Sequence, residues 1–227
     1  MQSQDQLKQA AAEAAASLVQ DGMIVGLGTG STAAFAVAAL GVRVKAGLRI
    51  IGIPTSEATA QQAKSLNIPL STLAEHPEID LAIDGADEIV PGTLHLTKGR
   101  GGALLREKLV EVAAQRLIII ADDSKIVTRL GSKMPIPVEV IPFAWESTAK
   151  RLEALGARAS MRDGFTTDSG NYILDCHFAP IADPVTLAAK IKAITGVVEH
   201  GMFLNMATQV FLARPAGVEQ LVRTSTD

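Results

Sequence analysis

The sequence predicts an α/β protein in which a large parallel sheet is joined to a smaller α+β unit. Three observations lead to this prediction. Short apolar runs alternate with helix-like segments as far as residue 121, and the order of elements changes after about Gly131. The chain has 227 residues, of which 48% are hydrophobic and 20% are charged. That length suffices for one large domain with a smaller companion.

The first part of the chain alternates helices with strands. Apolar runs predict strands at residues 23–28, 48–53, 78–83 and 116–121. A first helix is expected at residues 5–20 and should end at Asp21–Gly22. A second should start from a cap at Ser31 or Thr32 and end near Leu40, and a third should follow the N-cap Ser56. A fourth is expected at 103–114. Strands that are apolar on both faces and alternate with helices indicate a parallel sheet covered on both sides.

The second part follows another order. Strands are expected at residues 135–141, 157–162, 171–178 and 197–203, and helices at 145–156 and 183–196, the latter with Asp183 as N-cap and Pro184 at its first position. The order β-α-β-β-α-β is that of a ferredoxin-like unit. A last strand at 208–213 is expected to rejoin the first sheet. The sequence therefore predicts a ferredoxin-like α+β domain at 131–206, and a larger domain at 1–130 plus 207–227.

Composition argues against several classes of protein. The net charge of -3, the pI near 5.8 and the lack of a basic run argue against a nucleic-acid partner. Cys176 is the only cysteine and the four histidines are scattered, so we expect neither a disulfide framework nor a metal site. The N-terminus lacks the features of a signal peptide, and no apolar run approaches the ~20 residues of a membrane span. A cytoplasmic protein without membrane contact is expected.

A glycine-rich loop, "GLGTGST" at 26–32, joins the first strand to its helix. Backbone N–H groups at such a helix start suit a phosphate. The loop is not a Walker loop, because no lysine follows Gly30, and Ser31 stands where the dinucleotide fingerprint has its third glycine. Two interpretations stay open: a site for a terminal sugar phosphate, or a tight turn with a Ser/Thr cap.

Acidic residues follow the third strand in "LAIDGADE" at 81–88. Asp84, Asp87 and Glu88 stand where an apolar run ends, and burying unpaired carboxylates costs several kcal/mol. They are either solvated at the end of the strand or held there for chemistry. Ligands of parallel sheets bind at the carboxyl ends of strands, which favours chemistry if other functional groups gather there.

Further candidates stand at two other strand ends. Lys98 precedes a glycine-rich turn in "HLTKGRGGALLREK", and Glu107 lies in the helix that follows. The apolar face of that helix is predicted to be Leu104, Leu105, Leu109, Val112 and Ala113, with Glu107 near its edge. Lys125 in "ADDSK" follows the fourth strand. Each of these residues alone is compatible with a solvated surface charge, but their shared position at strand ends predicts one site.

The segments "GLGTGST", "DGADE", "KGRGGALLREK" and "ADDSK…PIPVEVIP" closely resemble ribose-5-phosphate isomerase of the A type, in the order of that family and over nearly the whole chain. The resemblance implies a Rossmann-like domain with a smaller ferredoxin-like one. It also implies the interconversion of D-ribose 5-phosphate and D-ribulose 5-phosphate in the non-oxidative pentose phosphate pathway. No metal or redox cofactor and a homodimer or homotetramer are expected.

The same resemblance implies the site residues. The substrate-binding residues would be Thr29, Gly30, Ser31, Thr32, Asp84, Gly85, Ala86, Asp87, Lys98, Gly99, Arg100, Gly101, Lys125 and, more weakly matched, Lys8. Glu107 would be the proton acceptor. The chain departs from the family at Arg100, where many members have glycine, and in the spacing of Asp87 and Lys98, which is one residue longer than in some relatives. Both departures bear on the geometry of the loop.

The chemistry of an aldose–ketose isomerisation suits these residues. Glu107 would carry the proton between neighbouring carbons, and Asp84 would open the sugar ring and shuttle hydroxyl protons. Asp87 would orient substrate hydroxyls, and Lys98 would offset the negative charge of an enediolate. These four residues are the predicted catalytic set.

Other functions remain possible at this stage. An amino-sugar phosphate deaminase or a CoA transferase of similar fold is one alternative, although a deaminase needs a histidine beside its acids. None of the four histidines lies in the segments that carry the resemblance. A domain that senses a sugar phosphate without turnover is another alternative, and it would need the phosphate loop but not the Lys98–Glu107 pair.

Overall fold

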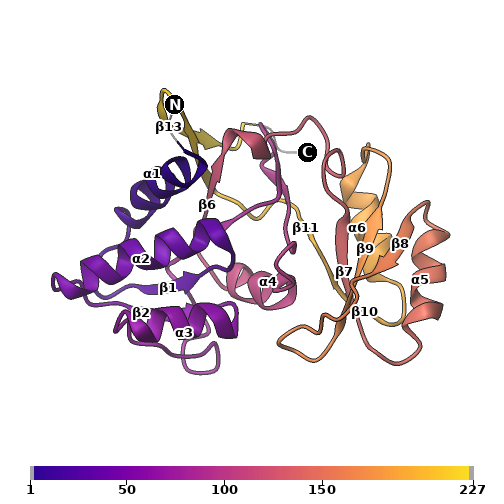
Figure 1. Cartoon of the computed structure of the whole chain (residues 1–227), viewed down its shortest axis with the longest axis horizontal. Helices are drawn as coiled ribbons and strands as arrows, with labels where there is room; N and C mark the ends of the chain where they lie inside the picture. Colours follow the sequence, from indigo (N-terminus) through magenta and orange to yellow (C-terminus); the bar gives the residue numbers. More distant parts are fainter. Residues whose placement is uncertain (1–2, 225–227) are drawn as a thin grey trace.

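The computed structural model describes residues 3–224, which form three sheets and their covering helices (Figure 1). Residues 1–2 and 225–227, which the predicted larger domain includes, lie outside the described residues. In Figure 1, α1, α2, α3, β1 and β2 stand on one side of α4, and α5, α6 and β7 to β10 stand on the other. The α/β class and the two-part architecture predicted from the sequence are confirmed.

The largest sheet has six strands in the order β13-β12-β6-β3-β1-β2. Its strands are β1 (Ile24–Leu27), β2 (Ile51–Pro54), β3 (Leu81–Gly85), β6 (Leu117–Asp122), β12 (Gln209–Arg214) and β13 (Gly217–Val222). All neighbours are parallel except β13, which pairs antiparallel with β12. Because β1 lies between β2 and β3, the chain leaves β1 and β3 in opposite directions. Such a switch point opens a crevice at the carboxyl ends of the two strands.

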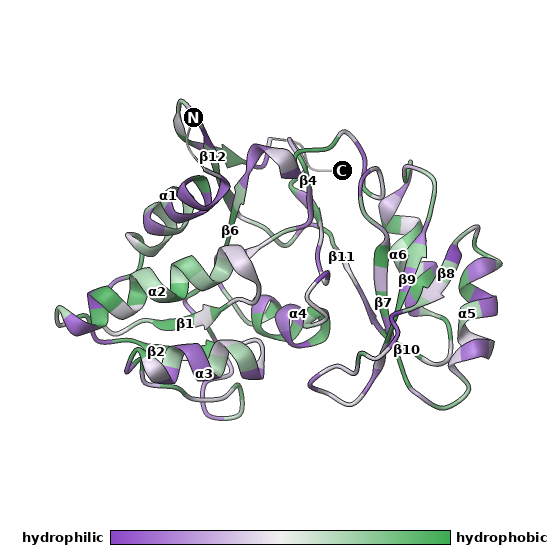
Figure 2. Cartoon of the chain, viewed as in Figure 1, coloured by the Kyte–Doolittle hydropathy of each residue, from purple (hydrophilic) through white to green (hydrophobic). Residues whose placement is uncertain are grey.

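Helices cover both faces of this sheet. They are α1 (Gln4–Ala16), α2 (Ser31–Lys45), α3 (Glu57–Ser65) and α4 (Leu104–Val112). Buried alanines of α1 and α2 pack with the β1 side chains Val25 and Leu27, and Figure 2 shows α2 as largely hydrophobic. The opposite face of β1 carries Gly26, where a Cβ atom would lie 2.8 Å from Val110 of α4. The missing side chain therefore lets α4 pack directly beneath the crevice.

The second part is a four-stranded antiparallel sheet in the order β10-β7-β9-β8. Its elements in chain order are β7 (Ile136–Val140), α5 (Trp145–Glu153), β8 (Arg158–Met161), β9 (Tyr172–His177), α6 (Pro184–Lys192) and β10 (Val197–His200). Asp183 caps α6 by accepting a hydrogen bond from the Thr186 N–H, as the sequence predicts. This is the β-α-β-β-α-β order of a ferredoxin-like unit, and it encloses a core cluster of its own.

A small three-stranded sheet connects the two parts. It consists of β4 (Glu88–Val90), β5 (His95–Thr97) and β11 (Met202–Phe203) in the order β11-β5-β4. The sequence analysis expected one strand at 197–203, and this was wrong: β10 pairs with β7, whereas β11 pairs with β5. The boundaries at residues 131 and 206 stay predictions. One strand of the predicted smaller domain thus pairs with a hairpin of the larger one.

The structure also differs from the sequence prediction at the ends of several helices. Helix α1 ends at Ala16 rather than residue 20, and α2 continues to Lys45 rather than Leu40. The N-cap of α2 is Gly30 without a side-chain hydrogen bond, so the predicted cap at Ser31 or Thr32 was wrong, whereas the Ser56 cap of α3 is confirmed. The sequence analysis did not predict the hairpin β4–β5 or the edge strand β13.

The predicted apolar face of α4 was wrong in part, although Leu104 is buried as expected. Leu109 and Val112 are 55% and 71% exposed, while Glu107 and Glu111 are among the buried residues. The helix is thus turned so that carboxylates face the protein interior.

Within residues 3–224, the structure has no helix with the length and apolarity to cross a membrane.

The third acid of "LAIDGADE", Glu88, holds the chain where it passes from β6 to β7. Its carboxylate is fully buried and accepts hydrogen bonds from the N–H groups of Gly131, Lys133 and Met134. The Thr97 hydroxyl of β5 donates to it as well. Glu88 therefore ties the small sheet to the segment that leads into the second part, and it lies outside the pocket.

We predict that Glu88→Gln lowers the free energy of unfolding by about 3 kcal/mol, because the new amide group must face backbone N–H donors and the charge that they bind is lost. Thermal or urea unfolding measures the change. Glu78→Gln, at an exposed position, is the matched control and should stay within about 0.5 kcal/mol of the parent. Equal stability of both variants would contradict the structural role of Glu88.

Candidate active site

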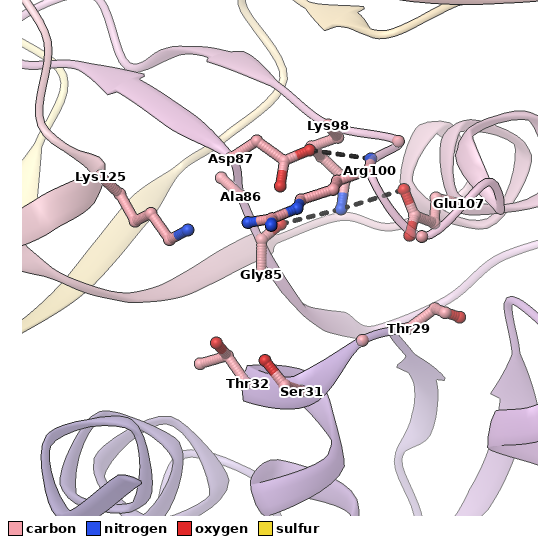
Figure 3. A pocket seen from close by; sticks show the side chains of 13 residues that line it. Thr29, Ser31, Thr32, Gly85, Ala86, Asp87, Lys98, Arg100, Glu107 and Lys125 are labelled. Carbon is pink, nitrogen blue, oxygen red and sulfur yellow. Dashed lines mark hydrogen bonds and ion pairs between the residues drawn. The ribbon is translucent and has the colours of Figure 1, made fainter. Parts of the chain in front are cut away.

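A pocket of about 410 Å³ opens at the switch point between β1 and β3 (Figure 3). It is lined by Thr29, Gly30, Ser31, Thr32, Gly85, Ala86, Asp87, Lys98, Gly99, Arg100, Gly101, Glu107 and Lys125. Every loop that the sequence analysis selected contributes to it. Two predicted residues, Asp84 and Lys8, do not line the pocket.

The loop after β1 presents a helix start to the pocket. Gly30 has φ 103°, a left-handed conformation that favours glycine, and α2 begins at the next residue. The first-turn N–H groups of a helix have no partner within it, and no side chain caps this one. The Ser31 and Thr32 side chains point into the pocket (Figure 3), and Lys8 Nζ lies 3.4 Å from Ser31 Oγ. N–H groups, hydroxyls and a nearby ammonium together form an anion site.

Thr29 has a different role from its two neighbours. Its hydroxyl points away from the pocket (Figure 3) and joins the hydroxyls of Thr55, Ser56 and Thr59 at 2.6–3.2 Å. Its N–H donates to Asp84 Oδ1 at 3.1 Å. Thr29 therefore lines the pocket with its backbone and fixes the loop against α3 and β3.

Asp84 lies behind the pocket wall, with 1% of its surface exposed. Oδ1 accepts the N–H groups of Thr29 and Gly85, and Oδ2 lies 2.9 Å from Lys98 Nζ. A Cβ atom at Gly28 would lie 2.2 Å from Asp84 Cγ, so glycine is required for this approach. The structure places Asp84 against Lys98 rather than at the pocket surface, and its direct contact with substrate stays a prediction.

The ammonium of Lys98 binds four oxygen atoms. Nζ donates to the Gly85 carbonyl at 2.9 Å and lies 3.4 Å from Glu107 Oε2 and 3.2 Å from Glu111 Oε1, in addition to Asp84. Only 2% of Lys98 is exposed. Burial by itself lowers the pKa of Lys98, but the three carboxyl groups raise it well above its usual value. Lys98 is therefore a permanently charged centre of the site.

Glu107 forms part of the pocket wall, although only 4% of its surface is exposed. Burial raises its pKa to about 8, since the attraction of Lys98 is partly cancelled by the charge of Asp84. A carboxyl group with such a pKa is a much stronger base than an ordinary glutamate and still ionises near neutral pH. The structure therefore places a basic carboxyl group at the pocket surface, beside a cation.

Glu111 is a member of this cluster that the sequence analysis missed. It is 3% exposed, lies one turn after Glu107 on the same face of α4, and does not line the pocket. Burial raises its pKa well above the usual value. The signal was the spacing of four residues between Glu107 and Glu111, which puts both side chains on one side of a helix.

Three polar residues form the opposite rim. Asp87 accepts a hydrogen bond from the Arg100 N–H at 3.0 Å, which connects the loop after β3 with the loop after β5. Burial raises the pKa of Asp87. Lys125, at the end of the short 3₁₀ helix Asp123–Lys125, points toward the pocket (Figure 3). The loop that carries Arg100 is therefore held by Asp87 through its backbone.

Lys108 anchors α4 on the side away from the pocket. Its Nζ lies 2.9 Å from Glu199 Oε1 and donates to the carbonyls of His200 and Met202. The Phe203 ring lies between two cations, 4.5 Å from Lys108 Nζ and 5.3 Å from Lys98 Nζ. These contacts fix the helix that carries Glu107.

Among residues 3–224, no three His, Cys, Asp or Glu side chains are grouped so as to hold a metal ion.

Comparison with known families gives one match that spans most of the chain. The model of ribose 5-phosphate isomerase A (phosphoriboisomerase A) matches residues 51–217. The chain belongs to this family. Members of the ribose 5-phosphate isomerase A family interconvert D-ribose 5-phosphate and D-ribulose 5-phosphate, so the chain is an aldose–ketose isomerase. The alternatives of a deaminase, a CoA transferase and a sensing domain without turnover are thereby excluded.

Individual relatives cover almost the whole chain. Ribose-5-phosphate isomerase A of Synechococcus sp. (strain JA-3-3Ab) is 61% identical over 97% of this chain and 99% of its own length. The structure of the isomerase A from Methanocaldococcus jannaschii has a TM-score of 0.94 at 42% identity and covers 97% of this chain and all of its own. A D-ribose-5-phosphate isomerase in complex with phospho-erythronic acid has a TM-score of 0.95 at 39% identity, over 98% of this chain and 100% of its own.

Proposed function

We propose that the chain converts D-ribose 5-phosphate into D-ribulose 5-phosphate through an enediolate, and that Glu107 moves the proton between the two reacting carbons. The observation that carries this proposal is the position of Glu107 at the pocket wall, 3.4 Å from Lys98 Nζ and with a pKa near 8. As a carboxylate it takes the proton from one carbon and returns it to the next. The group is basic enough for the first step and acidic enough for the second.

The phosphate of the substrate binds at the start of α2. The free N–H groups of the first turn and the hydroxyls of Ser31 and Thr32 face one wall of the pocket. Lys8 adds a positive charge beside Ser31. The relative solved with phospho-erythronic acid binds a phosphorylated sugar acid, which agrees with a sugar-phosphate ligand for this family. This end of the substrate is bound equally in the ground state and the transition state.

The reacting end lies against Lys98, Asp87 and Glu107. The charge of Lys98 offsets the negative charge that develops on the enediolate oxygens. Asp87, which lines the pocket, orients the sugar hydroxyls, and Lys125 and Arg100 border the same space. Asp84 is the predicted group for ring opening and for the hydroxyl protons, and it lies against Lys98 behind the pocket wall. These roles, the homodimer or homotetramer and the cytoplasmic location stay predictions.

We predict that Glu107→Gln abolishes turnover while the protein stays folded. Gln keeps the size and the hydrogen bonds of Glu but cannot accept a proton from carbon. Loss of a general base lowers kcat by roughly 10²–10⁴-fold. The rate is measured as ribulose 5-phosphate formation, and exchange of the C2 proton with solvent deuterium should be lost as well.

Two controls accompany the Glu107→Gln variant. Ribose 5-phosphate should still raise its melting temperature, because the phosphate contacts lie elsewhere. Glu153→Gln, at an exposed position of α5, should have the kcat of the parent. A folded Glu107→Gln protein with near-native kcat would overturn the mechanism, and Asp84 would be the next base to test.

Thr32→Val is predicted to raise KM by about 10- to 100-fold with kcat nearly unchanged. The lost hydroxyl donates to a charged phosphate, a hydrogen bond that contributes about 1.5–3 kcal/mol, and the contact is the same in ground state and transition state. Initial rates against substrate concentration measure both constants. Thr195→Val, exposed on the second part of the chain, is the matched control. Turnover of free ribose as fast as that of its phosphate would reject the phosphate site.

The pKa of Glu107 predicts the pH dependence of kcat/KM. Below about pH 8 the free enzyme holds a proton on Glu107, so the active base form and kcat/KM increase with pH and level off above that value. The substrate phosphate, with a second pKa of about 6, adds a separate and more acidic step. A pH series of initial rates checks this. If kcat/KM instead rose with pH in one step, at the ordinary pKa of a glutamate side chain, Glu107 with its raised pKa would not be the titrating base.

A further inference from the structure

Four buried side chains form what we call the Lys98 cluster: Asp84, Lys98, Glu107 and Glu111. None of them is more than 4% exposed. With every group ionised, three carboxylates would face one ammonium, which leaves two uncompensated negative charges in the interior. Such an excess is strongly destabilising, so the cluster has to retain at least one proton in the folded protein.

The contacts of each carboxyl group indicate where that proton lies. Asp84 accepts two backbone N–H groups and lies 2.9 Å from the Lys98 ammonium, an environment that favours the charged form. Glu107 borders the pocket. Glu111 has neither advantage: no backbone N–H group donates to either of its oxygens, and it does not line the pocket. Its contact with Lys98, at 3.2 Å, is to an ammonium that it shares with Asp84 and Glu107. A buried carboxyl group without donors is most stable when neutral.

We propose that Glu111 is a positioning residue which, as a neutral carboxylic acid, donates its proton to Asp84 and holds Asp84 and Lys98 in place behind Glu107. This rests on the proposed function of Glu107. The two carboxyl groups meet at the same ammonium, since Asp84 Oδ2 lies 2.9 Å and Glu111 Oε1 lies 3.2 Å from Lys98 Nζ. Asp84 Oδ2 accepts no backbone N–H or O–H group in a hydrogen bond, so it has room to accept that proton. Glu111 does not touch the substrate, so it acts through the two residues that it holds.

The charged groups around Glu111 agree with a neutral form. Asp84 faces it from β3, Lys98 from the end of β5, and Glu107 and Lys108 from α4 itself. Lys108 is already paired with Glu199 of β10 at 2.9 Å. Burial raises the pKa of Glu111, Lys98 lowers it, and Asp84 and Glu107 raise it, with a net shift well upward.

A neutral Glu111 has a consequence for catalysis. It leaves Lys98 with two carboxylates instead of three, so that Glu107 can lose its proton near neutral pH. A third negative charge beside Lys98 would raise the pKa of Glu107 further and reduce the fraction of active base. The resting proton on Glu111 thus keeps Glu107 usable.

Glu111→Gln tests the proposal, because Gln imitates a neutral acid in shape, can donate to Asp84 and can accept from Lys98. We expect kcat to stay within about threefold of the parent. The apparent pKa with which kcat/KM rises on the acidic side of the pH profile, its acidic limb, should shift by less than about 0.3 pH units, since no charge changes. Glu111→Leu removes both contacts and should lower kcat by about tenfold or more with KM nearly unchanged, as expected when a reacting group is displaced. Recovery in the Gln variant separates positioning from simple packing.

Glu139→Gln is the matched control, because Glu139 is also a buried carboxyl group but lies away from the pocket against Thr167 and Asn171. It should change neither kcat nor the acidic limb. A fall of about one pH unit or more in the acidic limb of Glu111→Gln would mean that a negative charge has been removed. That result would overturn the proposal.

Infrared difference spectra provide a readout that needs no turnover. At pH 7, the spectrum of the wild type minus that of the Glu111→Gln variant should contain the carbonyl band of one protonated carboxyl group. The spectrum of the wild type minus that of Glu107→Gln shows the bands of Glu107 separately. Carboxylate bands in place of the carbonyl band would overturn the proposal. Failure of the proposed function would instead appear as an active Glu107→Gln enzyme, so the two failures are distinguishable.

Discussion

The buried ammonium of Lys98 is the interaction on which the rest of the site depends. It joins three elements: the end of β3 through Asp84 and the Gly85 carbonyl, the end of β5, which Lys98 follows, and α4 through two glutamates. Removing one partner of such a cluster leaves the others as unpaired buried charges, which is far more destabilising than losing a surface ion pair. The relative position of these three elements is therefore fixed by electrostatics as well as by apolar packing.

The backbone around the cluster is arranged to make this contact possible. Strand β5 pairs with β4 on one side and with β11 on the other, and Lys98 follows it directly. Lys98 lies across the pocket from Ser31 and Thr32 at the start of α2 (Figure 3). Gly28 leaves room for Asp84, and Gly26 leaves room for α4. Gly201 serves the same purpose, since a Cβ atom there would lie 2.2 Å from the Lys98 carbonyl oxygen. Small residues at these points allow polar groups to approach one another closely.

Sequence patterns predicted most of the fold and the position of the pocket, because the parallel strands are continuous apolar runs and their ends carry the functional segments. What sequence left open depends on tertiary contacts. The run 197–203 has no turn signal stronger than Gly201, and the pairing partners β7 and β5 divide it into two strands. The rotation of α4 is set by Lys98 and Lys108, which is why exposed Leu109 and buried Glu111 reverse the hydropathy expectation.

The pocket combines two environments with opposite requirements. The proposed phosphate site at α2 consists of N–H groups and hydroxyls at the pocket wall, and it would bind an anion without a change in any protonation state. The wall formed by Glu107 is buried, where ionising a carboxyl group is unfavourable and its basicity is high. Binding at the first site holds the sugar against the second and excludes water there. Phosphate affinity can thus offset the free energy needed to keep a strong base in the interior.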